Sequence, residues 1–200
     1  MNDTYISNIP SMTVDAIVES LGHAYATLLQ KGLPLRTMPS VMLWGPPGIG
    51  KSQAVRQIAS KIQESTGKEV HITDVRLLLF NPTSNADKTL AVWLKPQIFQ
   101  MDDSDRVVNL LFLDEISAAP PSVQAAAFQI TLDRRIGEHV LPENCIVMAA
   151  GNRITDRSVA FKMPKALANR LMHIEVEASF SSWKKWAVST GIHSKGIGFL

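Results

Sequence analysis

The stretch "WGPPGIGKSQ", residues 44–53, decides how the rest of this 200-residue chain is interpreted. It holds two prolines, three glycines, a lysine and a serine, and it continues the short apolar run at 41–45. Apolar residues at helical spacing follow it, at Ala54, Val55, Ile58, Ala59 and Ile62. The stretch therefore predicts a tight loop between a buried strand and a helix.

The loop has the spacing Gly-x-x-x-x-Gly-Lys-Ser, which is typical of loops that bind phosphate groups. Glycines let consecutive backbone N–H groups converge on phosphate oxygens, and the helix that follows offers its positive end to the same anion. Lys51 is expected to reach the β- and γ-phosphates of ATP, and the Ser52 hydroxyl to bind Mg²⁺. The predicted nucleotide-binding residues are Gly45, Pro46, Pro47, Gly48, Ile49, Gly50, Lys51, Ser52 and Gln53.

Two carboxylates end the apolar run "LLFLDE", residues 110–115. At the carboxyl end of a buried strand they would lie where open α/β folds bind ligands. Asp114 can hold Mg²⁺ directly or through water. Glu115 can accept a proton from an attacking water, which favours hydrolysis over transfer to another acceptor.

Asn152 ends another apolar run in "MAAGNR", residues 148–153. Its amide could hydrogen-bond the γ-phosphate or the attacking water, and the alternative is a turn-forming asparagine after glycine. We include Asn152 with Glu115 among the candidate catalytic residues.

Strand and helix patterns alternate along the chain. Strands are predicted at 41–45, 69–74, 107–115, 145–152 and 171–177. Helices are predicted from an N-cap at Thr13, after the glycine loop, over 120–133, and from an N-cap at Ser182 over 183–190, with a further helix beginning near Ser194. This alternation indicates an α/β fold with a parallel sheet and helices on both of its faces.

Composition narrows the class of protein. Twenty Lys and Arg against 18 Asp and Glu give a net charge of +2, which does not call for a nucleic-acid partner. Cys145 is the single cysteine, so an intrachain disulfide is impossible and a reducing compartment is expected. The N-terminus resembles no signal peptide, and no apolar run reaches the roughly 20 residues of a membrane helix. We expect a soluble, cytoplasmic protein that does not enter a membrane.

These motifs together resemble the AAA+ ATPases, and within them the MoxR-like ATPases, over about residues 14–198. The resemblance is most specific in "FLDEISAAPPSVQAAAFQITLDRRIGEHVLPENCIVMAAGNR" and "MPKALANRLMHIEVE". It implies the P-loop NTPase fold, a three-layer α-β-α sandwich with a five-stranded parallel sheet of order 5-1-4-3-2. It also implies a β-hairpin at 134–144. Residues 1–178 would form the nucleotide-binding domain, with 1–40 as its N-terminal helix and connector, and 179–200 would begin a truncated helical lid.

The resemblance also assigns roles to single residues. Asn152 corresponds to the sensor 1 residue, and Arg170 to the arginine finger that reaches the ATP of a neighbouring subunit. A guanidinium there would stabilise charge that develops on the transferred phosphoryl group. Arg153, Arg134 and Arg135 are competing candidates for this role, and Arg170 could instead be a surface cation.

The family implies a partner set and a task. An arginine finger supplied in trans implies a ring of subunits, which would be a hexamer when the lid is complete. The family resemblance also implies that such a ring uses ATP to remodel or mature a protein client. A von Willebrand factor A domain protein is a frequent partner of such ATPases. Two departures stand out: residues 179–200 are too short to supply the second sensor arginine of the lid, and 81–96 is shorter than the corresponding family segment. Alternatives are a nucleic-acid-directed AAA+ motor and a nucleotide-gated binding module with little hydrolysis.

Overall fold

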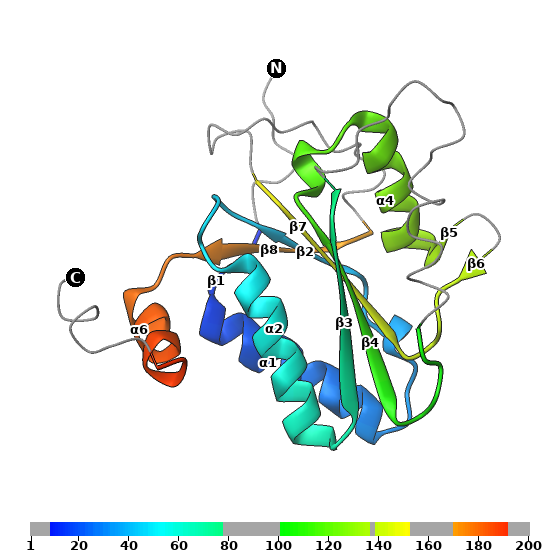
Figure 1. Cartoon of the computed structure of the whole chain (residues 1–200), viewed down its shortest axis with the longest axis horizontal. Coiled ribbons are helices and arrows are strands. Elements are labelled where there is room, and N and C mark those ends of the chain that lie inside the picture. Colours follow the sequence, from blue (N-terminus) through cyan, green and yellow to red (C-terminus); the bar gives the residue numbers. More distant parts are fainter. Residues whose placement is uncertain (1–8, 78–100, 137–138, 153–169, 192–200) are drawn as a thin grey trace.

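The computed structural model describes residues 9–77, 101–136, 139–152 and 170–191. Within them, parallel strands form one main sheet in the order β1-β8-β2-β7-β4-β3, and a two-stranded antiparallel hairpin stands beside it (Figure 1). The strands of the main sheet are β1 (Ser11–Thr13), β2 (Val41–Trp44), β3 (Glu69–Arg76), β4 (Val107–Asp114), β7 (Cys145–Gly151) and β8 (Met172–Glu177). The hairpin consists of β5 (Arg135–Ile136) and β6 (His139–Val140), inside the predicted range 134–144.

The helices among the described residues are α1 (Val14–Gln30), α2 (Lys51–Thr66), α4 (Pro121–Asp133) and α6 (Phe180–Ser189). Two short 3₁₀ turns, η2 (Leu35–Thr37) and η4 (Ile116–Ala118), complete the described elements. Thr13 caps α1 as predicted, with its hydroxyl accepting from the Ala16 N–H. Proline at the first turn opens α4, where its missing N–H costs no helical hydrogen bond.

The predicted strand order is confirmed, with one addition. The five predicted strands correspond to β2, β3, β4, β7 and β8, and their observed order is 5-1-4-3-2. The sixth strand, β1, pairs with β8 at one edge of the sheet. Because β1 spans only three residues, it is too short for an alternation of polarity to mark it as a strand.

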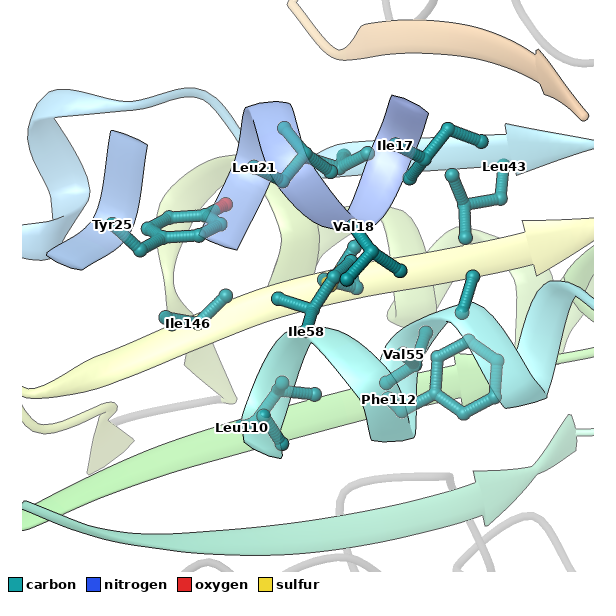
Figure 2. Close-up of a cluster of buried hydrophobic side chains, with 14 of the residues drawn as sticks. Ile17, Val18, Leu21, Tyr25, Leu43, Val55, Ile58, Leu110, Phe112 and Ile146 are labelled. Carbon is teal, nitrogen blue, oxygen red and sulfur yellow. The ribbon is translucent and has the colours of Figure 1, made fainter. Parts of the chain in front are cut away.

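Two hydrophobic clusters lie on opposite faces of the sheet, which gives the molecule its three layers. Along β4, Leu110 and Phe112 belong to the cluster under α1 and α2, whereas Leu111 and Leu113 belong to the cluster under α4. Figure 2 shows how side chains of the first cluster interleave between the two helices and strands β2, β4 and β7. Phe112 is only 1% exposed, and burying a side chain of this kind contributes about 1.5–3 kcal/mol.

Each of the five predicted strands has one boundary that was predicted wrongly. Strand β2 ends at Trp44 instead of residue 45, and β8 begins at Met172 instead of residue 171. Strand β3 continues to Arg76, because its pairing with β4 runs on to Asp114. Strand β4 ends at Asp114 and β7 at Gly151, one residue earlier than predicted in each case.

The N-cap of α6 was also predicted wrongly. Ser179 holds this position and accepts from the Ser182 N–H at 3.2 Å, whereas Ser182 is buried inside the first turn. The helix predicted near Ser194 and the segment 81–96 lie outside the described residues. None of the described helices is both long and apolar enough to cross a bilayer.

The parallel register gathers the carboxyl ends of three central strands at one edge. Gly151 at the end of β7 pairs with Trp44 at the end of β2, and Leu113 of β4 pairs with Ala149 of β7. Segments more than 60 residues apart in sequence therefore meet directly beyond these strands. This edge is where ligands of open α/β sheets bind.

Candidate functional site

The glycine loop connects β2 to α2 as predicted, and two of its glycines are required by the backbone. Gly45 has a φ of 151°, and a Cβ there would lie 3.3 Å from the Val176 carbonyl oxygen. Gly50 has a φ of 104° and stands at the N-cap of α2, where no side chain caps the helix. Glycine has no side chain to cap this 16-residue helix, and the positive end of a helix is a favourable place for an anion.

The outer part of the loop faces solvent. Pro46, Pro47 and Gly48 are exposed, while Ile49, Ser52 and Gln53 are half-buried. Exposed backbone at the tip and a helix N-terminus at the base form a concave strand-to-helix turn.

Lys51 connects the loop to the neighbouring strand. Its ammonium group donates to the Gly45 carbonyl at 2.6 Å, to the Pro46 carbonyl at 3.0 Å and to Asn152 Oδ1 at 3.0 Å. The residue is only 8% exposed. A buried ammonium needs such acceptors, and phosphate oxygens are stronger acceptors than carbonyls.

Ser52 of α2 and Asp114 of β4 are joined by a hydrogen bond. The Ser52 hydroxyl donates to Asp114 Oδ2 at 3.0 Å. A hydroxyl and a carboxylate oxygen at this separation are hard ligands of the kind that Mg²⁺ prefers, with water and phosphate oxygens filling its other positions. The donor set therefore fits Mg²⁺ bound together with a nucleotide.

Glu115 has an unusual backbone conformation for a residue other than glycine. Its φ of 58° and ψ of 32° lie in the left-handed region, and its N–H donates to Asp114 Oδ1 at 2.8 Å. This conformation ends β4 and starts the η4 turn. Such strain is found where a side chain must be aimed, so it is consistent with a functional role for the half-buried Glu115.

Asn152 lies beside Lys51 at the end of β7. Besides its amide contact with Lys51, its backbone N–H donates to the Ser117 hydroxyl at 2.7 Å. Ser117 lies two residues beyond Glu115, is 5% exposed, and was not among the predicted site residues. A serine after an acidic pair carries no local signal, because its partner is 35 residues away.

Asp74 of β3 is a second residue that the sequence analysis missed. Burial raises the pKa of Asp74, and the nearby Asp114 carboxylate raises it further. Arg76, and Arg56 of α2 at 3.9 Å from Asp74 Oδ2, offset only part of this effect, so the pKa of Asp74 stays above its ordinary value. The register of β3 against β4 adds this carboxylate to the acidic environment of Asp114.

The candidate arginines fall in different places. Arg170 is exposed in the turn directly before β8, outside the hydrogen-bonded cluster. Arg134 lies at the far end of β7 from Asn152, where its guanidinium donates to the Cys145 carbonyl at 2.6 Å. Arg135 is exposed on the hairpin, and Arg153 lies outside the described residues.

Comparison with known proteins agrees with this geometry. The pattern of the ATPase family associated with various cellular activities (AAA) matches residues 40–173. Among individual proteins, the human peroxisomal ATPase PEX1 is 26% identical over 147 residues, which is 66% of this chain and 12% of that protein.

Solved structures share the fold at low sequence identity. The RuvB Holliday junction branch migration motor of Thermotoga maritima is 18% identical, with a TM-score of 0.56 over 90% of this chain and 52% of that one. PCH-2 of C. elegans is 16% identical, with a TM-score of 0.54 over 95% of this chain and 52% of that one. The chain thus spans about half the length of these two structures. The family match covers the glycine loop, the acidic pair and the Asn152 strand end, and the chain belongs to the ATPase family associated with various cellular activities (AAA).

Proposed function

We propose that this chain binds ATP together with Mg²⁺ and hydrolyses it to ADP and inorganic phosphate. The observation that carries the proposal is the meeting of three distant segments at one sheet edge. Lys51 contacts Asn152, and Ser52 contacts Asp114, each at 3.0 Å. The uncapped start of α2 stands beside them.

Each residue has a task that its chemistry suits. The loop N–H groups and Lys51 bind the phosphates, and Ser52 with Asp114 holds Mg²⁺. Mg²⁺, when bound, neutralises charge on the phosphate oxygens. Water attacks the γ-phosphorus, the bond to the ADP oxygen breaks, and the Glu115 carboxylate accepts the water proton. Asn152 orients the water or the γ-phosphate.

Two variants test this division of labour. Lys51→Ala should weaken ATP binding by about 10–100-fold, because charge-assisted hydrogen bonds are lost. Glu115→Gln should keep ATP binding and lower the hydrolysis rate by about 10²–10⁴-fold. Lys31→Ala, at the exposed C-cap of α1, and Glu64→Gln, at an exposed position of α2, change the same residue types and serve as controls. Full activity in Glu115→Gln would contradict the proposal.

We further propose that Arg170 acts in trans within a ring. Its support is an exposed position directly before β8, from which a neighbouring subunit is accessible. Arg170→Ala should bind ATP normally and lose about 10³–10⁵-fold in rate. Mixing Arg170→Ala with Lys51→Ala subunits should restore part of the activity, because each supplies what the other lacks. Absence of rescue would argue against a shared site.

The cellular task that we propose is MoxR-like remodelling or maturation of a protein client, with a von Willebrand factor A domain protein as partner. Residues 1–178 would form the nucleotide-binding domain and 179–200 part of a lid, working as a hexamer in the cytoplasm. The motifs "FLDEISAAPPSVQAAAFQ" and "ALANRL" support this assignment. Stimulation of the ATPase rate by such a partner would favour the MoxR-like assignment. Stimulation by DNA would instead favour a nucleic-acid-directed motor, and ATP binding without hydrolysis would favour a nucleotide-gated binding module.

A further inference from the structure

Ser117 connects the two polar segments that follow β4 and β7. It lies in η4, two residues after Glu115, and its residue is 5% exposed. Its hydroxyl accepts the backbone N–H of Asn152 at 2.7 Å, a short hydrogen bond for this donor and acceptor. The turn that begins at Glu115 is thereby joined to the strand end that carries Asn152.

The same serine is held from its other side by α4. Gln124, which is also 5% exposed, donates from Nε2 to the Ser117 carbonyl at 3.2 Å and to the Ala119 carbonyl at 3.0 Å. A buried amide bonded to two carbonyls of one turn fixes that turn against the helix. The Ser117 hydroxyl is therefore presented to Asn152 by a rigid element.

Gly151 makes this approach possible. A Cβ at this position would lie 3.0 Å from Ser117 Oγ and 2.7 Å from the terminal methyl of Met42. The Gly151 carbonyl also accepts from the N–H of Gly45, the first glycine of the loop, at 3.3 Å. Residues 151 and 152 thus contact the phosphate loop on one side and Ser117 on the other.

We propose that Ser117 is a positioning residue that sets the placement of Asn152 relative to Glu115, so that the amide and the carboxylate act on the same water. The proposal rests on the proposed hydrolysis and extends it to a residue outside the phosphate loop and the acidic pair. Ser117 is buried and its hydroxyl is bonded to the Asn152 backbone, so its effect would pass through that backbone. A displacement of about 1 Å at a reacting group can cost on the order of 100-fold in rate.

The kinetic test compares Ser117→Ala with Ser60→Ala. Ser60 is exposed on α2, and its hydroxyl also bonds a backbone group, the Arg56 carbonyl at 3.2 Å. In Ser117→Ala, kcat should fall about 10–100-fold, while KM and the Kd for a non-hydrolysable ATP analogue change less than about threefold. Ser60→Ala should match the wild type. Unchanged kcat in Ser117→Ala, or nucleotide binding weakened as much as kcat, would overturn the proposal.

A second measurement reads the contact itself without nucleotide. Hydrogen exchange at the Asn152 amide, followed by NMR, should be at least about tenfold faster in Ser117→Ala, because an unpaired N–H loses its protection. Gly151→Ala, which pushes Ser117 away but keeps its hydroxyl, should reproduce both effects. Faster exchange with unchanged kcat would leave Ser117 with a structural role alone and refute positioning. If instead the wild type shows no hydrolysis that depends on Glu115, the proposed function itself fails, and this outcome is visible before any Ser117 variant is made.

Discussion

The left-handed conformation of Glu115 predicts that a glycine at this position gives a more stable protein than an alanine does. A residue with a Cβ in this region costs about 1–2 kcal/mol relative to the right-handed form. Glycine avoids that cost but loses about 0.5–1 kcal/mol of additional chain entropy on folding. Glu115 has a φ of 58°, so Glu115→Gly should be more stable than Glu115→Ala by about 0.7 kcal/mol, the difference between the middle values of these two ranges.

Comparing these two variants isolates the contribution of the backbone to the free energy of unfolding, because both variants lack the carboxylate. In urea unfolding, Glu115→Gly should show the higher midpoint with an unchanged slope. In thermal unfolding, the difference corresponds to about 1–4 °C for a domain of this size. Both variants should hydrolyse ATP no faster than Glu115→Gln, which keeps the side-chain volume.

The outcome would separate two roles of one residue. A glycine variant that is more stable and inactive would mean that the strain is maintained for function. If Glu115→Gly is less stable than Glu115→Ala, the backbone argument is wrong. If it keeps wild-type hydrolysis, the carboxylate is not the base.

Further predictions concern the metal, the thiol and the core. Ser52→Ala removes the hydroxyl that meets Asp114 and should raise the Mg²⁺ concentration for half-maximal hydrolysis about tenfold or more, measured by Mg²⁺ titration; an unchanged requirement would exclude Ser52 as a ligand. Burial raises the pKa of Cys145 to about 12, so the thiol stays protonated at pH 8, and a thiol reagent should label it only in urea. Rapid labelling of the native protein would contradict this burial. Phe112→Ala should lower the free energy of unfolding, measured in urea, by about 3–5 kcal/mol, because this 1% exposed ring fills the cluster under α1 and α2. A decrease below about 1 kcal/mol would contradict this and show that neighbouring side chains fill the cavity.

The sheet and the glycine loop could be predicted because their sequence signals are local. Apolar runs such as 107–113 and 145–150 mark strands buried on both faces, and the glycine spacing marks the turn between β2 and α2. Asp114 and Asn152 follow from them, since parallel strands bring their carboxyl ends to one edge. These residues could be predicted because each is a polar residue directly after an apolar run, and because parallel strands gather their carboxyl ends at one edge.

What could not be predicted depends on contacts between distant segments. The serines at 179, 181 and 182 each have the chemistry of an N-cap, and the choice of Ser179 depends on the burial of Ser182 and the stacking of Phe180 on Trp183 at 5.8 Å. The same limit applies to Asp74, whose proximity to Asp114 comes from the register of two strands more than 30 residues apart.

The contact between Lys51 and Asn152 would change when a nucleotide binds. The Lys51 ammonium donates to two loop carbonyls and to the Asn152 amide oxygen. A phosphate must offer Lys51 a better acceptor than these, and the charge of its oxygens does so. If Lys51 turns to the phosphate, the Asn152 amide loses a donor and becomes available to a water or a γ-phosphate oxygen. Its backbone meanwhile stays bonded to Ser117, so only the amide side chain is released. One buried ammonium can therefore link the glycine loop to the neighbouring strand and transmit the binding of a nucleotide to that strand.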